Sequence, residues 1–217
     1  MKTKLSFRAR SARKLIIMLL FLTIGVIAKS QAFFGGVAAG AVTSQVDGDD
    51  NNGFHKAGFT AGAFVGLELS DIFDIQFEIK YIQKGSKSSA DEPVSFTIKL
   101  DYIEMPLIVS ANLGFININN KQLKWISLEA GASVDVLANV NQQTNGVNEI
   151  ASNKWKKICF NGIIGVKFNI TEKLLLGTRI ITSINSVYDG NGMNAMRFGQ
   201  WGAFNDVLEL VLYYRFK

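Results

Sequence analysis

The sequence is poor in the residues from which many catalytic, metal-binding and disulfide-stabilised sites are built. Its 217 residues include one cysteine, one histidine and two prolines. The lone Cys159 excludes an internal disulfide. The sequence has no phosphate-binding loop, dinucleotide fingerprint, nucleophile elbow or zinc-ligand spacing. We therefore expect no catalytic residue, no cofactor and no metal site.

The first 30 residues lack acidic side chains altogether and contain seven lysines and arginines. The apolar run that follows the basic start, residues 15–28, is shorter than the roughly 20 residues of a transmembrane helix. Small residues then allow cleavage after Ser30 or Ala32. We predict a cleaved signal peptide over residues 1–30. A retained anchor helix is the alternative, and no other stretch of the chain approaches the length of a membrane-spanning helix.

The basic character of the sequence belongs to this leader. Removal of seven of the 23 basic residues leaves 23 − 7 = 16, against 18 acidic residues, which gives a formal net charge of −2. A mature chain with this balance offers no reason to expect nucleic acid as a partner.

The last twelve residues, 206–217, alternate strictly between two kinds of side chain. Such a period of two indicates a β-strand, and about ten residues suffice for a tilted strand to cross a bilayer. A soluble strand with one face on a core would show the same pattern. One face is apolar or aromatic throughout, and its members are Leu208, Leu210, Leu212, Tyr214 and Phe216. The other face is mixed and contains Val207, Glu209, Val211, Tyr213, Arg215 and Lys217.

Seven earlier stretches also have strand patterns, so about eight strands are predicted. In residues 96–113 the apolar parity changes near Pro106, and we expect a bulge there. The earlier stretches are residues 33–44, 57–69, 74–85, 96–113, 123–136, 158–170 and 174–187.

The connections between these strands alternate in length. The long polar ones are 45–56, 86–95, 138–155 and 188–205, and the short ones are 70–73, 115–122 and 171–173. Membrane barrels sort long external loops and short periplasmic turns onto opposite rims. The sequence therefore predicts an all-β fold for residues 31–217, namely a transmembrane antiparallel up-and-down β-barrel. It would lie in the cell outer membrane, in contact with outer-membrane lipid.

The mixed strand faces carry charges that would point into the barrel. An eight-stranded barrel is only wide enough for side chains, so these charges should pair inside. We expect a structural plug, with Arg179 as the partner of Glu209. A narrow conduction or ligand path is the alternative. The predicted interior charges are Glu68, Glu78, Lys80, Asp101, Glu129, Lys167, Arg179, Glu209 and Arg215.

Two further sites can be considered in the loop around His55. Small outer-membrane barrels include lipid-modifying enzymes that use a histidine with a serine and a carboxylate, and Ser44, Asp49 and Asp50 lie nearby in sequence. Together with Asp47, the two aspartates also suggest calcium, but the further ligands of an EF-hand loop are missing. Loop composition alone explains both clusters.

Several short motifs resemble the PorT-like family of Bacteroidetes outer-membrane β-barrels. The resemblance implies an outer-membrane barrel from a Gram-negative bacterium, and the founding member of the family is linked to type IX secretion and gliding. The Tyr-x-Glu-x-Pro element within residues 102–108 is its most specific part. The motifs lie at residues 35–41, 53–58, 77–85, 102–108, 128–132 and 213–216.

We therefore expect a non-enzymatic protein with a structural or interaction role. The resemblance suggests an accessory of a cell-envelope or type IX secretion complex, with other envelope proteins as partners. The alternatives are a lipid-modifying enzyme that uses His55, a narrow porin-like pore and a soluble lipocalin-like carrier.

Overall fold

The computed structural model describes residues 32–49, 53–89, 91–92, 94–118, 121–149, 154–190, 193 and 195–216. Residues 33–217 form one compact unit. The predicted signal peptide lies outside the described residues. Within the described part of the chain, no helix is both long and apolar enough to cross a membrane.

The described residues of the compact unit form antiparallel strands, eight of them long and three of them short. The long strands are β1 (Phe33–Asp47), β2 (Lys56–Glu68), β3 (Phe73–Lys87), β4 (Phe96–Ile118), β5 (Lys121–Thr144), β7 (Ile158–Asn169), β8 (Leu174–Ser183) and β11 (Phe204–Arg215). The short strands are β6 (Val147–Glu149), β9 (Ala195–Arg197) and β10 (Gln200–Gly202).

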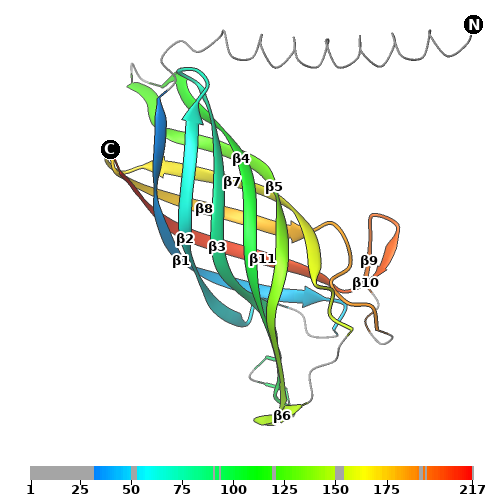
Figure 1. Ribbon diagram of the computed structural model, residues 1–217. Helices are drawn as coiled ribbons and strands as arrows, with labels where there is room; N and C mark the ends of the chain where they lie inside the picture. The colour runs from blue at the N-terminus through cyan, green and yellow to red at the C-terminus, as the bar shows by residue number, and fades with distance from the viewer. Residues whose placement is uncertain are drawn as a thin grey trace, which may run out of the picture. The chain divides into compact units, whose positions relative to one another are not determined.

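The eight long strands close into a barrel. Neighbours follow the order β4-β3-β2-β1-β11-β8-β7-β5, and β4 also pairs with β5, so the sheet has no open end (Figure 1). The closing seam joins the first and last strands, with Gly36 opposite Arg215 and Asp47 opposite Phe204. The predicted antiparallel up-and-down barrel of about eight strands is confirmed.

The two rims of the barrel differ in the length of their connections. Residues 48–55, 88–95, 145–157 and 184–203 join strands at one end, which we call the long-loop rim. The connections 69–72, 119–120 and 170–173 join strands at the other end, the short-turn rim. The predicted sorting of loops is therefore confirmed. β4 runs past its predicted end at the short-turn rim. β5 continues to Thr144 at the long-loop rim, where it projects together with the start of β4 and with β6 (Figure 1).

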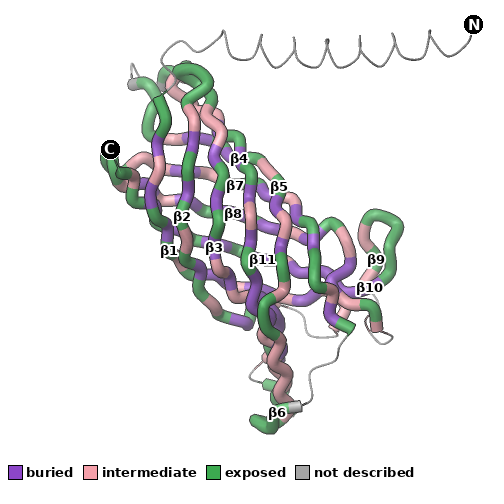
Figure 2. Tube along the Cα trace, in the orientation of Figure 1, coloured by how far each residue is buried: buried purple, intermediate pink, exposed green. Residues whose placement is uncertain are grey.

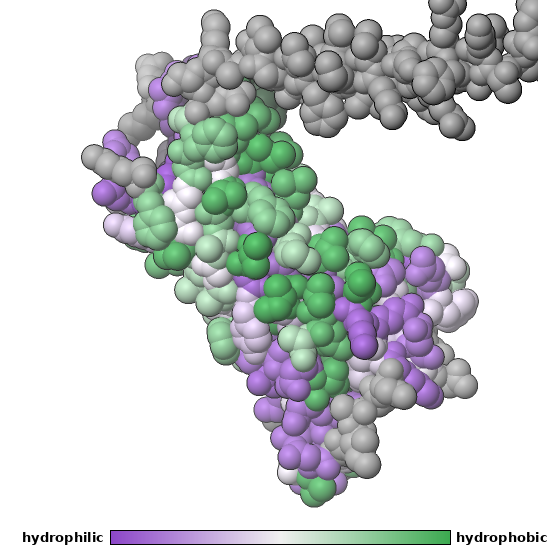
Figure 3. Space-filling view, in the orientation of Figure 1, coloured by the Kyte–Doolittle hydropathy of each residue, from purple (hydrophilic) through white to green (hydrophobic). Residues whose placement is uncertain are grey.

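A belt of outward apolar side chains surrounds the barrel between its two rims. Figure 3 shows hydrophobic residues there and hydrophilic residues over the end that carries β6. In β11 the predicted parity is correct, because Leu208, Leu210 and Leu212 are exposed while Glu209 is buried. The apolar belt consists of Val37, Phe59, Val65, Phe77, Ile79, Leu107, Val109, Leu128, Ile164, Ile180, Leu208, Leu210 and Leu212.

The interior of the half nearer the long-loop rim is a packed apolar cluster, the loop-side core. Burial alternates along the strands that enclose it (Figure 2). The side chain of Tyr102 is fully buried, as are those of Ile98 and Leu100 on the same strand. The loop-side core consists of Val42, Val46, Ile82, Ile98, Leu100, Tyr102, Ile108, Trp155, Cys159, Ile163, Ile181, Val187, Ala203 and Val207.

This core corrects the expectation for β4. Even-numbered residues face inward both before and after Pro106, and the pairing with β5 continues across it, Pro106 opposite Ser133. The predicted parity shift at Pro106 is therefore wrong. The irregularity lies earlier, between Asp101 and Tyr102, where β5 has an extra residue. Beyond the apolar belt the barrel is surrounded by water, as a soluble protein is. The apolar face of β4 therefore turns inward there, while Lys99 faces out.

Candidate functional site

Nine charged side chains of the described residues meet inside the barrel, and we call them the charge network. Each is at most 3% exposed. They come from β3, β4, β5, β7, β8 and β11, whereas β1 and β2 contribute none. The members are Glu78, Lys80, Lys84, Glu104, Glu129, Asp135, Lys167, Arg179 and Glu209.

Arg179 on β8 is the centre of one half of the network. Its Nε lies 2.7 Å from Glu129 Oε2 and its Nη2 lies 3.2 Å from Glu129 Oε1, which makes a bidentate pair. Its Nη1 lies 2.9 Å from Glu78 Oε1. The guanidinium also lies over the Tyr213 ring, 5.3 Å from its centroid, and the Tyr213 hydroxyl donates to Glu78. A planar cation with five donors suits this forked arrangement, which an ammonium could not satisfy.

Gly165 on β7 makes the bidentate pair possible. It stands between the two partners in the sheet, opposite Glu129 on one side and opposite Arg179 on the other. A Cβ at this position would lie 2.8 Å from Arg179 Cγ and 2.6 Å from the Thr178 carbonyl oxygen. Because Gly165 has no side chain, Arg179 of β8 and Glu129 of β5 can form their ion pair across β7.

The other half of the network is a chain of ion pairs between lysines and carboxylates. Lys80 Nζ lies 2.6 Å from Glu209 Oε1 and 3.3 Å from Glu104 Oε2. Lys84 Nζ lies 2.7 Å from Asp135 Oδ2 and 3.5 Å from Glu104 Oε1. Glu104 thus links the two lysines, and the Ser133 hydroxyl donates a further hydrogen bond to it.

Lys167 on β7 connects the network to the short-turn rim. Its Nζ lies 3.3 Å from Glu129 Oε1 and 3.7 Å from Asp74 Oδ1. It also donates a hydrogen bond to the Ser110 hydroxyl at 3.0 Å. Every charge of the network therefore has an opposite charge within contact distance, as burial in a low-dielectric interior requires.

Six of the nine predicted interior charges fall in the network. They are Glu78, Lys80, Glu129, Lys167, Arg179 and Glu209. The expected partner of Glu209, Arg179, is its cross-strand neighbour, but Nη1 is 3.9 Å from Glu209 Oε2. Lys80 is the closer partner of Glu209.

Three of the predicted charges lie elsewhere. Arg215 Nη1 is 3.7 Å from Glu68 Oε1, and this half-exposed pair sits at the short-turn rim. Asp101 is on the outward face of β4, where it accepts hydrogen bonds from Gln83 and Asn139 and lies near Lys99. It therefore stands apart from the interior charges.

Sequence reasoning missed Lys84, Glu104 and Asp135. Lys84 has the parity of Glu78 and Lys80, and Asp135 has the parity of Glu129, so alternation was a sufficient signal for both. Glu104 was lost because a parity shift was assigned to its neighbourhood.

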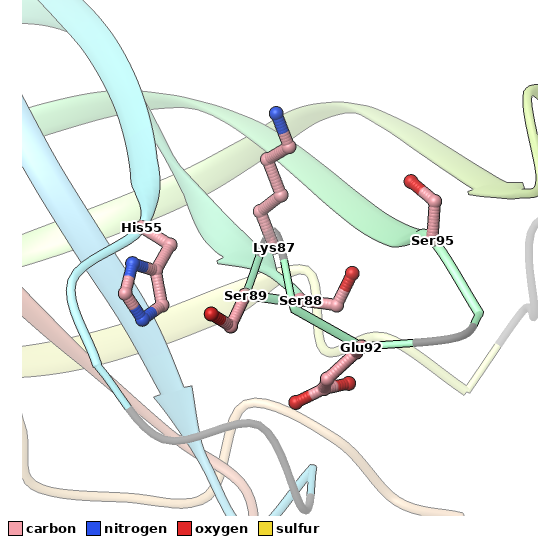
Figure 4. Close-up of a pocket in the computed structure, with 6 residues that line it drawn as sticks. All are labelled: His55, Lys87, Ser88, Ser89, Glu92 and Ser95. Carbon is pink, nitrogen blue, oxygen red and sulfur yellow. The ribbon is translucent and has the colours of Figure 1, made fainter.

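A polar cavity of about 340 Å³ lies at the long-loop rim, between His55 and the β3–β4 connection. It is lined by His55, Lys87, Ser88, Ser89, Glu92 and Ser95, and the Lys87 side chain extends away from His55 and Glu92 (Figure 4). Among the described residues, no side chain forms a hydrogen bond with the His55 ring. The ring instead lies against the backbone, since a Cβ on Gly53 would be 2.6 Å from its Nε2.

The acidic residues of the first long loop are also accounted for in part. Asp47 pairs with Arg197 of β9 at 3.1 Å, and Asp50 lies outside the described residues. The described residues contain no group of three or more His, Cys, Asp or Glu side chains arranged to hold a metal ion.

Comparison with curated protein sequences gives no significant match. Among solved structures, the chain is similar to Ail, the attachment invasion locus protein of Yersinia pestis, at 14% identity and a TM-score of 0.48, with 85% of this chain and 99% of that chain covered. It is similar to Neisserial surface protein A at 12% identity and a TM-score of 0.49, with 87% and 100% covered. It is similar to OprG of Pseudomonas aeruginosa at 10% identity and a TM-score of 0.35, with 85% and 94% covered.

A protein-family model also matches most of the chain. Residues 31–189 match the family described as outer membrane protein beta-barrel domain. This segment contains seven of the eight long strands, from β1 to β8. The chain therefore belongs to the outer membrane protein beta-barrel domain family, and the protein is located in the outer membrane.

Proposed function

We propose that this protein is a closed, non-enzymatic barrel with an interaction role, which uses the wall as a rigid support for its long loops. The observation that carries the proposal is the filled interior. The charge network fills the middle of the barrel and reaches the loop-side core, where Lys84 is opposite Leu100 and Asp135 is opposite Cys159. A solute could pass only if several buried ion pairs and packed apolar side chains separated together, which is energetically prohibitive.

Conductance in planar bilayers tests the closed interior. The purified barrel should add no stepwise current above the lipid baseline, while an open porin of known conductance serves as the positive control. Heat-modifiable migration on gels should verify that the inserted protein is folded. Stepwise currents from the folded protein would contradict the proposal and favour the narrow pore.

The alternative of a lipid-modifying enzyme receives little support from the rim cavity. A catalytic histidine needs a nucleophile or a carboxylate within hydrogen-bond reach, and within the described part of the chain the His55 ring packs against Gly53. We expect lipid A from cells with His55→Ala to have the same mass spectrum as lipid A from the parent strain. A mass difference that His55→Ala removes would favour the enzyme. The soluble lipocalin-like carrier is incompatible with the outer-membrane location.

We further infer that the protein is PorT-like and serves an envelope complex, type IX secretion being the candidate. The position of the Tyr-x-Glu-x-Pro element supports this assignment. Tyr102, Glu104 and Pro106 all face inward, where Glu104 joins Lys80 to Lys84. Other barrels whose interior is filled by the same charge network would need a carboxylate at the place of Glu104, and this motif supplies it.

Two experiments test the interaction role. Photo-crosslinking residues placed at Ser89 and Asn145 on the long loops should capture a protein in native membranes, while the same residue at Leu210 in the apolar belt should capture lipid. Deletion of the gene should then impair secretion of type IX substrates. If both loop sites captured only lipid, the interaction role would be contradicted, and normal secretion would remove the type IX assignment alone.

A further inference from the structure

A small hairpin in the last long connection has two unlike faces. β9 and β10 pair with Met196 opposite Trp201 and Arg197 opposite Gln200. Directly opposite residues of a hairpin point to the same side, and adjacent residues point to opposite sides. Met196 and Trp201 therefore share one face, and Arg197 and Gln200 share the other.

The Arg197 face is clamped to the outer wall of the barrel. Arg197 Nη1 lies 2.7 Å from Asp206 Oδ1 and Nη2 lies 2.8 Å from Asp206 Oδ2, a bidentate pair. The same side chain bonds Thr182 and, at 3.1 Å, Asp47. These partners stand on three adjacent strands, β11, β8 and β1. The guanidinium also covers the Phe204 ring at 5.0 Å, so the hairpin has a fixed position on the wall.

The clamp sits at the border of the apolar belt. Asp206 is opposite Thr182, and the next outward pair along the same strands is Leu208 opposite Ile180. Both Leu208 and Ile180 are exposed members of the belt. Two residues along a strand span about 7 Å, so the hairpin begins one side-chain row beyond the lipid-facing surface.

The other face of the hairpin and its tip are strongly apolar. Met196 is 62% exposed, Trp201 is 69% exposed and Phe198, in the turn, is 70% exposed. Three large apolar side chains on so short a hairpin do not contribute to its own packing, which leaves them available to a surrounding phase or a partner.

The turn itself is unusual for its residue at the first position. Phe198 and Gly199 both have positive φ, 49° and 75°. The β5–β6 hairpin has the same turn with Asn145 and Gly146 at 52° and 78°, the pair of residues that such turns favour. A bulky aromatic residue in the left-handed region is disfavoured. The presence of Phe198 in this conformation therefore indicates that its side chain serves a contact beyond the hairpin.

We propose that Met196, Phe198 and Trp201 insert into the boundary between headgroups and acyl chains of the outer leaflet, so that the hairpin extends the apolar belt sideways at the long-loop rim. The continuity with Leu208 and Ile180 selects lipid as the occupant. Tryptophan and phenylalanine are typical of this boundary. The bidentate clamp turns the apolar face away from the wall, toward the membrane that surrounds it.

Tryptophan fluorescence in vesicles tests the depth of the hairpin. The folded protein is inserted into phosphatidylcholine vesicles that carry bromine either near the headgroup or near the chain end, and iodide is the aqueous quencher. The contribution of Trp201 is the difference between the wild type and Trp201→Phe. It should be blue-shifted, quenched several-fold more by bromine near the headgroup than near the chain end, and protected from iodide.

The remaining outcomes would overturn the proposal. Quenching by iodide without quenching by brominated lipid would place Trp201 in water. Protection from both quenchers would indicate a protein partner, such as a second copy of the chain. A variant that retains only Trp155, which is buried in the loop-side core, should be protected from both and serves as the control.

Two substitutions test the turn and the clamp of the hairpin separately. Phe198→Asn installs the residue of the β5–β6 turn, so the hairpin should form at least as readily while Trp201 loses part of its quenching by brominated lipid. Arg197→Ala removes the clamp, and Trp201 should become accessible to iodide. If both variants kept the wild-type quenching pattern in folded barrels, the roles assigned to Phe198 and to the Arg197 clamp would be refuted.

Discussion

Lys80 Nζ lies 2.6 Å from Glu209 Oε1, although β1 and β2 separate the strands of these two residues in the ring. The contact spans the interior because inward positions between the two residues are small, namely Ala38 and Gly40 on β1 and Gly62 on β2. Lys80→Met or Glu209→Gln should lower the free energy of unfolding by about 3–5 kcal/mol, since each leaves a buried charge with fewer partners.

The double variant should cost less than the sum of the two single changes. Urea unfolding in lipid vesicles measures this coupling, and Glu209→Gln with Arg179→Met is the matched comparison at the longer 3.9 Å contact. Stronger coupling of Glu209 to Arg179 than to Lys80 would contradict the pairing.

Gly165→Ala should disrupt the Arg179–Glu129 pair, because the new Cβ would lie 2.8 Å from Arg179 Cγ. We expect a loss of about 1–3 kcal/mol, the usual range for overpacking. Gly162 on the same strand is the control, since a Cβ there meets nothing within 4 Å. Gly162→Ala should be neutral or stabilising by up to about 1 kcal/mol. Equal effects of the two changes in urea unfolding would argue against a steric role for Gly165.

Leu210 is 52% exposed in the middle of the apolar belt. Leu210→Arg should lower the stability of the inserted barrel by roughly 2–4 kcal/mol, the measured range for arginine on a lipid face near the bilayer midplane. Val147 is 68% exposed on β6, beyond the belt, so Val147→Arg should change stability by no more than about 0.5 kcal/mol. If Leu210→Arg left the stability of the inserted barrel unchanged, Leu210 would not face lipid.

The two faces of β4 near the long-loop rim can be told apart by truncation. Leu100 is fully buried in the loop-side core, and Lys99 faces outward. Leu100→Ala should destabilise by about 2–5 kcal/mol through lost burial and a cavity. Lys99→Ala should stay within about 0.5 kcal/mol. If Lys99→Ala destabilised the barrel more than Leu100→Ala in urea unfolding, the apolar face of this stretch would point outward, as the sequence suggested.

The long loops should lie outside the cell. In a Cys159→Ala background, a membrane-impermeant maleimide should label Asn145→Cys on intact cells and should reach Glu172→Cys only after the outer membrane is permeabilised. Both sites are exposed, so accessibility to the reagent differs only by side of the membrane. Labelling of Glu172→Cys alone on intact cells would invert the topology.

The number of strands, their antiparallel order and the sorting of loops were predictable from the sequence. Period-two patterns such as that of residues 206–217 divide each strand into two faces, and loop polarity locates the strand ends. For β11 the apolar face is the lipid face, so the alternation identified Leu210 as outward and Glu209 as inward.

The same alternation does not say which face is inside. Within the bilayer the apolar face turns outward, and beyond it the apolar face turns inward, so the pattern of β4 has opposite meanings at its two ends. The sequence gives no direct mark of where the bilayer stops. For this reason Asp101 was assigned to the interior and Glu104 was missed. Pairings such as Lys80 with Glu209 depend on strand tilt and side-chain reach, which no local pattern encodes.

The seam between β1 and β11 determines when the interior can be completed. Its two strands come from opposite ends of the barrel domain, and Glu209, the closest partner of Lys80, arrives only with β11. Before that strand docks, the sheet has two free edges and Lys80 lacks its nearest carboxylate. Contacts of such long sequence separation form slowly, and free edges promote aggregation. We therefore expect closure to come late in folding, and we expect the chain to be most vulnerable to misassembly between synthesis and closure.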